Sequence, residues 1–335
     1  MQPPLLVTAG DPTGIGPEVI LKALRRPLWA RARLIVIGDA RVFDAAARRL
    51  GVRYLRWPVM HSSIEALAGR DAITLLDVAH AGRFHPGRTS RSAGAASLHY
   101  LDVACDLLRR QETQGIVTAP VTKASIQQSH PSFIGHTEYF SRVFARPKVV
   151  MMFASERLRL VLLSRHVALR RVAASVTVQT IRTTLRVTID GLRRSFGIAR
   201  PRLAVLGLNP HAGEDGAFGD EERRLLAPTL KSMSRFARID GPFAADGFFA
   251  DASRAASYDA VVCWYHDQGL IPFKMRARDA GCQVTLGLPF VRTSPDHGSA
   301  LDIAGKGISH PGAMRYALEL AARLACTRKL SSWHS

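Results

Sequence analysis

The sequence predicts an α/β protein in which short apolar strands form a largely parallel sheet and alternate with amphipathic helices. Apolar runs such as 203–208 and 260–265 are typical of strands buried on both faces. Longer segments between the runs have helical spacing, as in the stripe formed by Ile181, Leu185 and Ile189. This alternation favours parallel strands joined by crossover helices.

The expected elements cover most of the chain, which at 335 residues and 47% hydrophobic content suits one large domain or two smaller ones. The expected strands are 5–9, 34–38, 115–118, 149–153, 158–163, 203–208 and 260–265. The expected helices are a first one ending at 24, then 41–50, 95–110, about 181–196 and 313–326. Gly51 and Gly197 are expected to close two of these helices, because glycine readily adopts the left-handed conformation that follows a helix.

Composition limits the classes of function. The net charge of +19 suggests nucleic-acid binding, but the basic residues are mostly dispersed arginines without a lysine-rich tail or a zinc-binding module. An arginine surface that attracts anionic metabolites is therefore favoured over specific nucleic-acid binding. No apolar run reaches membrane-spanning length, and the N-terminus lacks the basic region of a signal peptide. Four scattered cysteines without a CxxC pair indicate reduced, mostly buried thiols in a cytoplasmic protein.

The segment 208–222 carries the first candidate site residue. An Asn-Pro pair ends the preceding strand, a glycine-rich loop follows, and the acidic residues 220–222 open a helix as the helix dipole favours. His211 therefore lies on a loop beyond the carboxyl end of a strand, where open α/β sheets bind ligands. A capped turn with a surface histidine is the alternative interpretation of this segment alone.

Two further histidines occupy the same kind of position. His266 follows the strand 260–265, and His166 follows the strand 158–163. Three histidines at three strand ends can converge on one divalent cation, since imidazole is a common ligand of zinc and its neighbours. Their separations along the chain are far too long for a local zinc motif, so the repeated strand-then-histidine context carries this prediction.

A glycine-rich turn joins the first strand to the first helix at 10–18. Its backbone N–H groups can bind an anion at the helix N-terminus. The turn lacks the GxGxxG pattern of dinucleotide-binding folds, so a tight structural turn is an equally good interpretation.

Five segments together resemble the 4-hydroxythreonine-4-phosphate dehydrogenase (PdxA) family of vitamin B6 biosynthesis. They are 10–18, 135–138, 209–214, 265–269 and 286–294. The resemblance extends from about Val7 to the last helix. It implies a two-domain fold like that of isocitrate and isopropylmalate dehydrogenases, with the active site in the cleft between the domains. The implied domains are approximately 1–135 plus 295–335, and 136–294 with the metal histidines.

The resemblance also implies a homodimer in which both subunits contribute to each metal site, and it implies individual site residues. The implied ligands of a zinc, magnesium or cobalt ion are His166, His211 and His266. The implied substrate-binding residues are His136, Thr137, Lys274, Gln283 and Arg292. NAD or NADP is expected along 286–298, with Leu288, Pro289 and Asp296 as candidate contacts. No residue is assigned as a general base.

The implied reaction is oxidation of 4-phosphooxy-threonine at C3, after which the β-keto acid loses carbon dioxide. A divalent ion would acidify the hydroxyl as a Lewis acid, and Lys274 and Arg292 can neutralise phosphate or carboxylate. Asp267 and Asp296 are expected to orient ligands, and His297 to hold its loop.

One residue departs from the family pattern, because asparagine is usual at the position of Gln283. The substrate alternatives are threonate or erythronate 4-phosphate and, with less support from the phosphate-side residues, an aromatic cis-dihydrodiol. A non-catalytic binding protein is a further alternative, which the intact histidines argue against.

Overall fold

The computed structural model describes residues 4–24, 32–52 and 57–327. Contacts within the chain define two compact units, Met1–Ala145 with Pro289–Cys326 and Arg146–Leu288 with Thr327–Ser335. The N-terminal residues 1–3, which belong to the segment without signal-peptide character, lie outside the described residues. None of the helices in the described ranges is long and apolar enough to cross a membrane.

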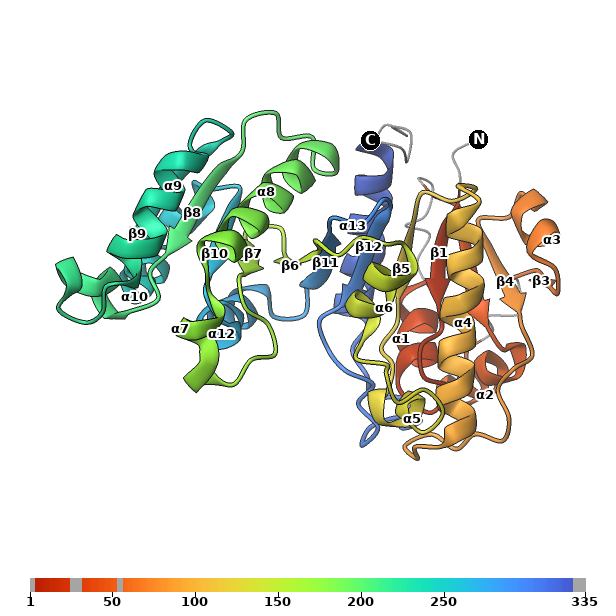
Figure 1. Ribbon diagram of the computed structural model, residues 1–335. Helices are drawn as coiled ribbons and strands as arrows, with labels where there is room; N and C mark the ends of the chain where they lie inside the picture. The colour runs from red at the N-terminus through yellow and green to blue at the C-terminus, as the bar shows by residue number, and fades with distance from the viewer. Residues whose placement is uncertain (1–3, 25–31, 53–56, 328–335) are drawn as a thin grey trace. The chain divides into compact units, whose positions relative to one another are not determined.

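The described part of the first unit contains a parallel sheet of six strands (Figure 1). In spatial order these are β3 (Val59–Met60), β4 (Ile73–Asp77), β2 (Leu34–Gly38), β1 (Leu5–Thr8), β5 (Gly115–Thr118) and β12 (Val291–Pro295). Every residue of β1, β2 and β5 is buried, which explains why their sequences are apolar except for the terminal Thr8 and Thr118.

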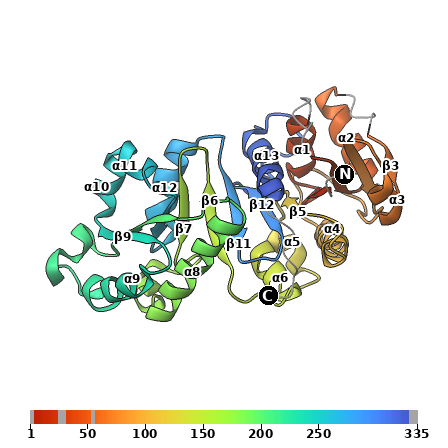
Figure 2. The ribbon, with the colours of Figure 1, turned by 90° about the horizontal axis from the view of Figure 1, so that it is seen from above.

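Helices cover both faces of this sheet. Figure 2 shows α1 (Gly16–Ala23), α2 (Ala40–Leu50) and α13 (Gly312–Thr327) on one face, and α4 (Arg91–Arg109), α5 (Lys123–Gln127) and α6 (His136–Val143) on the other. The short helix α3 (Ser63–Ala68) precedes β4. The carboxyl ends of the parallel strands all meet at one edge, which is where this architecture binds ligands.

The strands of the second unit are of mixed direction. In spatial order they are β11 (Cys282–Leu286), β6 (Val150–Ala154), β7 (Arg159–Leu162), β10 (Ala260–Cys263), β8 (Arg202–Leu206) and β9 (Arg238–Phe243). The pairs β7–β10, β10–β8 and β8–β9 are parallel, whereas β6 is antiparallel to both its neighbours. The four residues between β6 and β7 allow only a hairpin. The predicted α/β class with largely parallel sheets is confirmed.

Helices also cover both faces of the sheet in the second unit, with α8 (Val178–Arg194) and α9 (Ala227–Met233) on one (Figure 2). The other face carries α10 (Ala245–Ala250), α11 (Ala252–Ala256) and α12 (His266–Ala277). The remaining helical turns are η1 (Leu169–Arg171), α7 (Val172–Ser175), η2 (Pro210–Gly216) and η3 (Glu222–Leu226). Apolar side chains from β7, β8, β10, α10 and α12 form a buried core beneath α12.

The boundary between the units differs from the expected one. The expected second domain began at 136, but α6 lies in the first unit. The rings of Phe140 and Phe144 pack edge-on against Phe290, with centroids 5.8 and 4.8 Å apart, and the Tyr139 hydroxyl donates to Asp102. At the other boundary, β12 pairs with β5, so residues 289–294 also lie in the first unit.

Candidate active site

The three candidate metal histidines follow three adjacent strands of the second unit. His166 lies beyond β7, His211 beyond β8 and His266 directly after β10, and these strands are ordered β7–β10–β8 and run parallel. All three histidines are exposed. The carboxyl ends of parallel strands share one edge of a sheet, so the fold brings the three histidine-bearing segments to the same edge.

Hydrogen bonds tie these strand ends together. Trp264 at the end of β10 donates from its ring Nε1 to the carbonyl of Leu206, and its own carbonyl accepts from the Ser164 hydroxyl, at 2.6 and 2.7 Å. Gln268 bridges the same region, because its Oε1 accepts from Trp264 N and its Nε2 donates to the Gly207 carbonyl. The three segments therefore form one connected structure.

Two of the histidines lie close together. The ring centroids of His166 and His266 are 6.2 Å apart. Zinc binds imidazole nitrogen at about 2.1 Å, so two rings sharing one ion have centres roughly 5 Å apart, and this pair lies within about 1 Å of that geometry. Nδ1 of His266 is 2.6 Å from Oδ1 of Asp267 and donates to it, which leaves Nε2 as the lone-pair nitrogen of the neutral ring. The donor set fits a divalent metal.

His211 is placed differently. Its ring centroid is 6.0 Å from that of Phe218, and no group of three or more His, Cys, Asp or Glu side chains within the described part of a single chain is arranged to hold a metal ion. The metal-binding role of the three histidines therefore stays a prediction. Two histidines of the set, His166 and His266, come together, and the third lies on a neighbouring strand end.

The surroundings of His266 also differ from the expected ones. His266 is the first residue of α12, a helix that was not among those expected from the sequence, and Tyr265 is its N-cap. Pro272 lies inside this helix, and its presence hides the helical pattern in the sequence. Lys274 is exposed and lies eight residues along α12 from His266, which corresponds to about 12 Å of helix rise.

In the first unit, three of the expected substrate-binding residues lie near β5 and β12. Arg292 on β12 is 3% exposed and donates from Nη2 to the Thr118 hydroxyl on β5 at 2.7 Å. His136 and Thr137 begin α6, and Thr137 is also 3% exposed. A guanidinium, a ring nitrogen and a hydroxyl are therefore held by rigid elements of one unit, which suits recognition of a phosphate or carboxylate.

The electrostatics of His136 define the charge of this cluster. Burial lowers the pKa of His136 well below its ordinary value of 6.5, and the positive charges of Arg292 and Lys123 lower that pKa further. The ring is consequently neutral at pH 7. Its Nε2 is buried and has no hydrogen-bond partner among the described residues. A buried polar atom of this kind is a natural contact for a bound molecule.

Gln283 and the expected cofactor contacts are also largely buried. Gln283 on β11 is 5% exposed and donates from Nε2 to the Thr285 hydroxyl at 3.0 Å. Leu288 is buried, and Pro289 and Asp296 are half-buried, with Asp296 directly after β12. Buried Leu288 can contribute packing to a cofactor site, whereas Asp296 stands at the carboxyl edge of its sheet with part of its surface accessible.

The turn between β1 and α1 is a structural turn. The amides of Asp11, Gly14 and Ile15 donate to the carbonyls of Pro120, Asp11 and Ser299, and the Thr13 amide donates to the Asp11 carboxylate. These donors are occupied within the protein, so the anion-binding interpretation of the turn is not supported.

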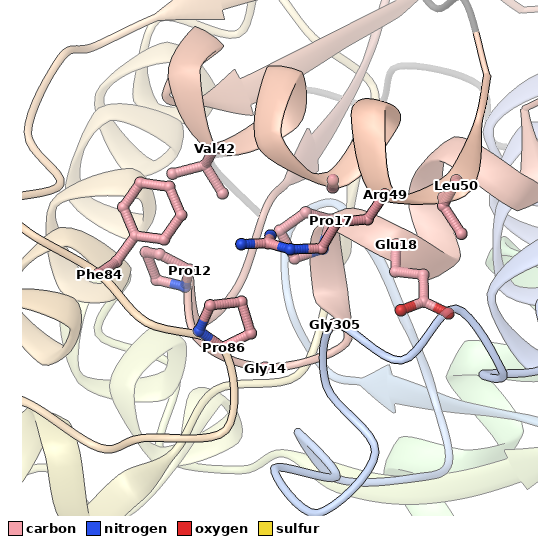
Figure 3. Close-up of a pocket in the computed structure, with 11 residues that line it drawn as sticks. Pro12, Gly14, Pro17, Glu18, Val42, Arg49, Leu50, Phe84, Pro86 and Gly305 are labelled. Carbon is pink, nitrogen blue, oxygen red and sulfur yellow. The ribbon is translucent and has the colours of Figure 1, made fainter.

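A small hollow of about 20 Å³ lies beside this turn. Its walls include Pro12, Pro17, Phe84 and Pro86, and Figure 3 shows the Arg49 side chain extending into it. The Glu18 carboxylate also lines it, and the space is too small for a small-molecule ligand.

An α/β protein with histidines at adjacent strand ends and a buried arginine–histidine cluster has the features of an enzyme that acts on a small anionic substrate. The chain matches the sequence profile of the family described as "Pyridoxal phosphate biosynthetic protein PdxA" over residues 30–321. It is 40% identical over 333 residues to the 4-hydroxythreonine-4-phosphate dehydrogenase of Desulforapulum autotrophicum, covering 96% of this chain and 95% of that protein.

Solved structures agree with this match. The crystal structure of 4-hydroxythreonine-4-phosphate dehydrogenase from Klebsiella pneumoniae is similar with a TM-score of 0.84 and 33% identity, covering 97% and 98% of the two chains. A terephthalate 1,2-cis-dihydrodiol dehydrogenase from Burkholderia xenovorans is similar with a TM-score of 0.64 and 27% identity, covering 95% and 97%. The chain belongs to the PdxA family and is an oxidoreductase of pyridoxal phosphate biosynthesis.

Two residues of the histidine edge have functions that the sequence did not suggest. Gln268 connects two of the strand ends, and Glu222 supports the loop that carries His211. Both lie in segments whose sequences stand out, but a glutamine after a strand and an acidic residue at a helix start are ordinary local features. Only their long-range partners distinguish them.

Proposed function

We propose that the chain is a cytoplasmic, metal-dependent, NAD(P)-linked dehydrogenase that oxidises 4-phosphooxy-threonine at C3, with loss of carbon dioxide from the β-keto acid product. The names of its relatives support the substrate. The observation that carries the metal dependence is the placement of three exposed histidines at one sheet edge, two of them with ring centroids 6.2 Å apart.

His166, His211 and His266 would hold the ion, and Asp267 would orient the His266 ring through the 2.6 Å contact at Nδ1. A bound divalent ion supplies Lewis acidity, which favours loss of the substrate hydroxyl proton and stabilises negative charge on oxygen. The zinc-type imidazole set does not by itself choose among zinc, magnesium and cobalt, although imidazole ligands favour the transition metals.

The protein's own cations and ring nitrogens would hold the substrate. Arg292, anchored by Thr118, presents a planar guanidinium to phosphate or carboxylate, and Lys274 adds a mobile positive charge. Neutral His136 can use its buried Nε2 to contact a substrate oxygen, and Thr137 adds a hydroxyl beside it. These groups would recognise an anionic end of the substrate.

We further propose that two copies of the chain complete each metal site. Large apolar side chains near the histidines are exposed, including Leu169 at 72%, Phe218 at 52% and Met275 at 75%. Such residues are enriched where protein surfaces associate. A symmetric dimer would bury them and could supply the third histidine that a single chain does not group with the other two.

For the cofactor, we propose that NAD or NADP lies along residues 286–298, with Leu288 and Pro289 before β12 and Asp296 after it as candidate contacts.

The alternative substrates are threonate 4-phosphate and erythronate 4-phosphate. They are supported by Gln283, which replaces the asparagine that is usual in the family. The test of the proposed function is a screen of the three phosphorylated hydroxy acids for NADH or NADPH formation. The protein is first stripped of metal with a chelator and is then assayed without metal and with added Zn²⁺, Co²⁺ or Mg²⁺. The proposal predicts metal-restored turnover, highest with 4-phosphooxy-threonine. Equal activity in protein shown to be metal-free would overturn it, and activity with only a cis-dihydrodiol would favour the relative of known structure from Burkholderia xenovorans as the better guide.

A further inference from the structure

The carboxylate of Glu222 is buried beneath the loop that carries His211. Glu222 is 4% exposed. Its Oε1 accepts hydrogen bonds from the backbone amides of Leu208 and Asn209, at 2.7 and 2.8 Å, and its Oε2 accepts from the Asn209 side-chain amide at 2.9 Å. All three donors lie in the two residues that lead from β8 into the turn bearing His211. One carboxylate thus fixes the start of that turn.

The turn itself has an unusual backbone. Five consecutive residues, 211–215, have positive φ values of 53, 55, 88, 40 and 53°. Only Gly213 among them lacks a side chain, and left-handed conformations are unfavourable for the other four. A run of this kind persists only where the surrounding structure imposes it, and such strain is concentrated at functional sites.

The carboxylate also packs closely against the loop. A Cβ atom added at Gly213 would lie 2.8 Å from Oε2 of Glu222, and one added at Gly207 would lie 3.2 Å from Oε1. Ala212 also packs against Gly207, since the Cβ atom added at Gly207 would lie 2.7 Å from the Cα of Ala212. The glycines therefore allow the loop to fold down onto the carboxylate.

Glu222 is held in turn by an irregular helix start. It is the first residue of the π-helical turn η3, and its carbonyl accepts the i+5 hydrogen bond from the Ala227 amide. Wide turns of this type occur often at functional sites, because they reorient one residue without interrupting the helix. Here the reoriented residue is the one that faces the His211 loop.

We propose that Glu222 is a positioning residue, which holds the 208–215 loop in the left-handed conformation that presents His211 to the metal. This inference rests on the proposed function for the role of His211. It does not require Glu222 to touch the metal or the substrate. Loss of the carboxylate should release the amides of Leu208 and Asn209, relax the loop and weaken metal binding.

The experiment compares Glu222→Gln, Glu222→Ala and His211→Ala with the wild type in the full-length protein. Zn²⁺ affinity is measured by competition with a chelator, and amide hydrogen exchange of segment 207–219 is measured in the metal-free protein. Asp220→Asn is the matched control. This substitution also removes one negative charge, two residues away, but at an exposed side chain that pairs with Arg224. Thermal unfolding identifies any variant that does not fold.

We expect Glu222→Ala to bind Zn²⁺ about 10- to 100-fold more weakly, as loss of outer-sphere support does. Its 207–219 amides should exchange faster even without metal. Glu222→Gln keeps an oxygen for the two backbone amides but turns an NH₂ group towards the Asn209 amide, so its loss should be smaller. If Glu222→Ala does not fold, the test rests on Glu222→Gln, which should show weaker Zn²⁺ binding and faster amide exchange than Asp220→Asn.

The inference is overturned if both Glu222 variants match Asp220→Asn in Zn²⁺ affinity and in amide exchange while His211→Ala loses Zn²⁺. If His211→Ala itself keeps wild-type affinity, the proposed metal role of His211 fails instead. Faster exchange with unchanged Zn²⁺ affinity would also overturn the inference, because the carboxylate would then serve only the stability of the loop.

Discussion

The arginine–histidine cluster of the first unit and the histidine edge of the second unit are built in opposite ways. Arg292 and Thr137 are each 3% exposed, and Arg292 is hydrogen-bonded to Thr118 on the neighbouring strand. The three candidate metal histidines, by contrast, are exposed at strand ends, and His211 lies in a run of left-handed residues. One region is complete when its unit folds, and the other is not.

This difference indicates which part of the chemistry the folded chain supplies alone. A preformed anion site loses little conformational entropy on binding, so it suits selection of the substrate. An exposed histidine edge with two rings together and a third apart requires a bound ion, and in our proposal a second chain, to bring its groups into a working arrangement. Substrate selection and metal chemistry should therefore respond differently to mutation.

The largest effect is expected for His211→Ala. Activity should fall by more than the roughly 100-fold that loss of outer-sphere support costs, and Zn²⁺ retention should fall with it. The unfolding free energy should change by no more than about 0.5 kcal/mol, because the side chain is exposed. Turnover, bound Zn²⁺ and thermal unfolding check these three expectations.

His130→Ala provides the control for that variant, because His130 is also exposed but lies in the first unit with no assigned role. It should behave as wild type in all three measurements. A His211 variant that loses activity only because it unfolds would remove the contrast between an exposed metal edge and a buried anion cluster.

A second prediction concerns the buried cluster. Arg292→Lys should lower kcat/KM by roughly 10- to 100-fold, since hydrogen bonds to charged groups contribute about 1.5–3 kcal/mol and lysine cannot reproduce the planar fork. The defect should appear mainly in KM, and Zn²⁺ affinity should be unchanged. Steady-state kinetics and chelator competition measure the two properties. Loss of Zn²⁺ binding in this variant would show that the two regions are not separate in function.

The third prediction is about Gln283→Asn, which restores the residue expected from the family pattern. Asparagine is shorter by one bond length, about 1.5 Å, so the hydrogen bond to Thr285 should be lost and the amide should face the substrate differently. A displaced polar contact costs about 1–3 kcal/mol, enough to change substrate ranking by roughly 10- to 100-fold. The kcat/KM values of both proteins for the three phosphorylated hydroxy acids test this predicted change in substrate ranking. Unchanged ratios would show that Gln283 is a neutral replacement.

The smallest effect is predicted for Lys123→Met. Removal of one positive charge should raise the pKa of His136, but only in part, because burial is the larger cause of the lowered value and Arg292 is still present. NMR titration of the His136 ring checks this. A pKa that does not move would show that Lys123 is screened from the ring.

The lowered pKa of His136 also predicts the direction of a pH effect on folding stability. With the folded pKa of His136 below 6.5, the unfolded chain binds the proton first as the pH falls. The contribution of His136 to stability is therefore complete above about pH 6.5 and is lost as the pH falls towards the lowered folded pKa. Lys123→Met should reduce this acid sensitivity, as measured by denaturant unfolding at a series of pH values.

Much of this architecture was predictable because burial leaves a direct mark on composition. The strands β2 and β10 are apolar throughout and β8 is apolar after Arg202, since both faces are covered, and the strand-end position of the histidines follows from that pattern alone. The helix α12 was missed because Pro272 and polar residues interrupt its periodicity.

Other features were not accessible because they depend on partners distant in the chain. The assignment of α6 to the first unit depends on ring contacts with Phe290. The left-handed turn at His211 depends on Glu222, whose acidic side chain has the composition of an ordinary helix start. Patterns in the sequence identified the candidate histidines, but not what supports them.

The most direct test of the central claim is complementation between inactive variants, using co-expressed chains with two different tags so that only mixed dimers are purified. If each metal site takes His166 and His266 from one chain and His211 from the other, His211→Ala mixed with either His166→Ala or His266→Ala contains one intact site. We predict that both of these mixed dimers bind one Zn²⁺ and regain about half of the wild-type turnover, whereas His166→Ala mixed with His266→Ala regains neither. Failure of all three mixtures would contradict a site shared between chains, and recovery only in the third would contradict the pairing of His166 with His266.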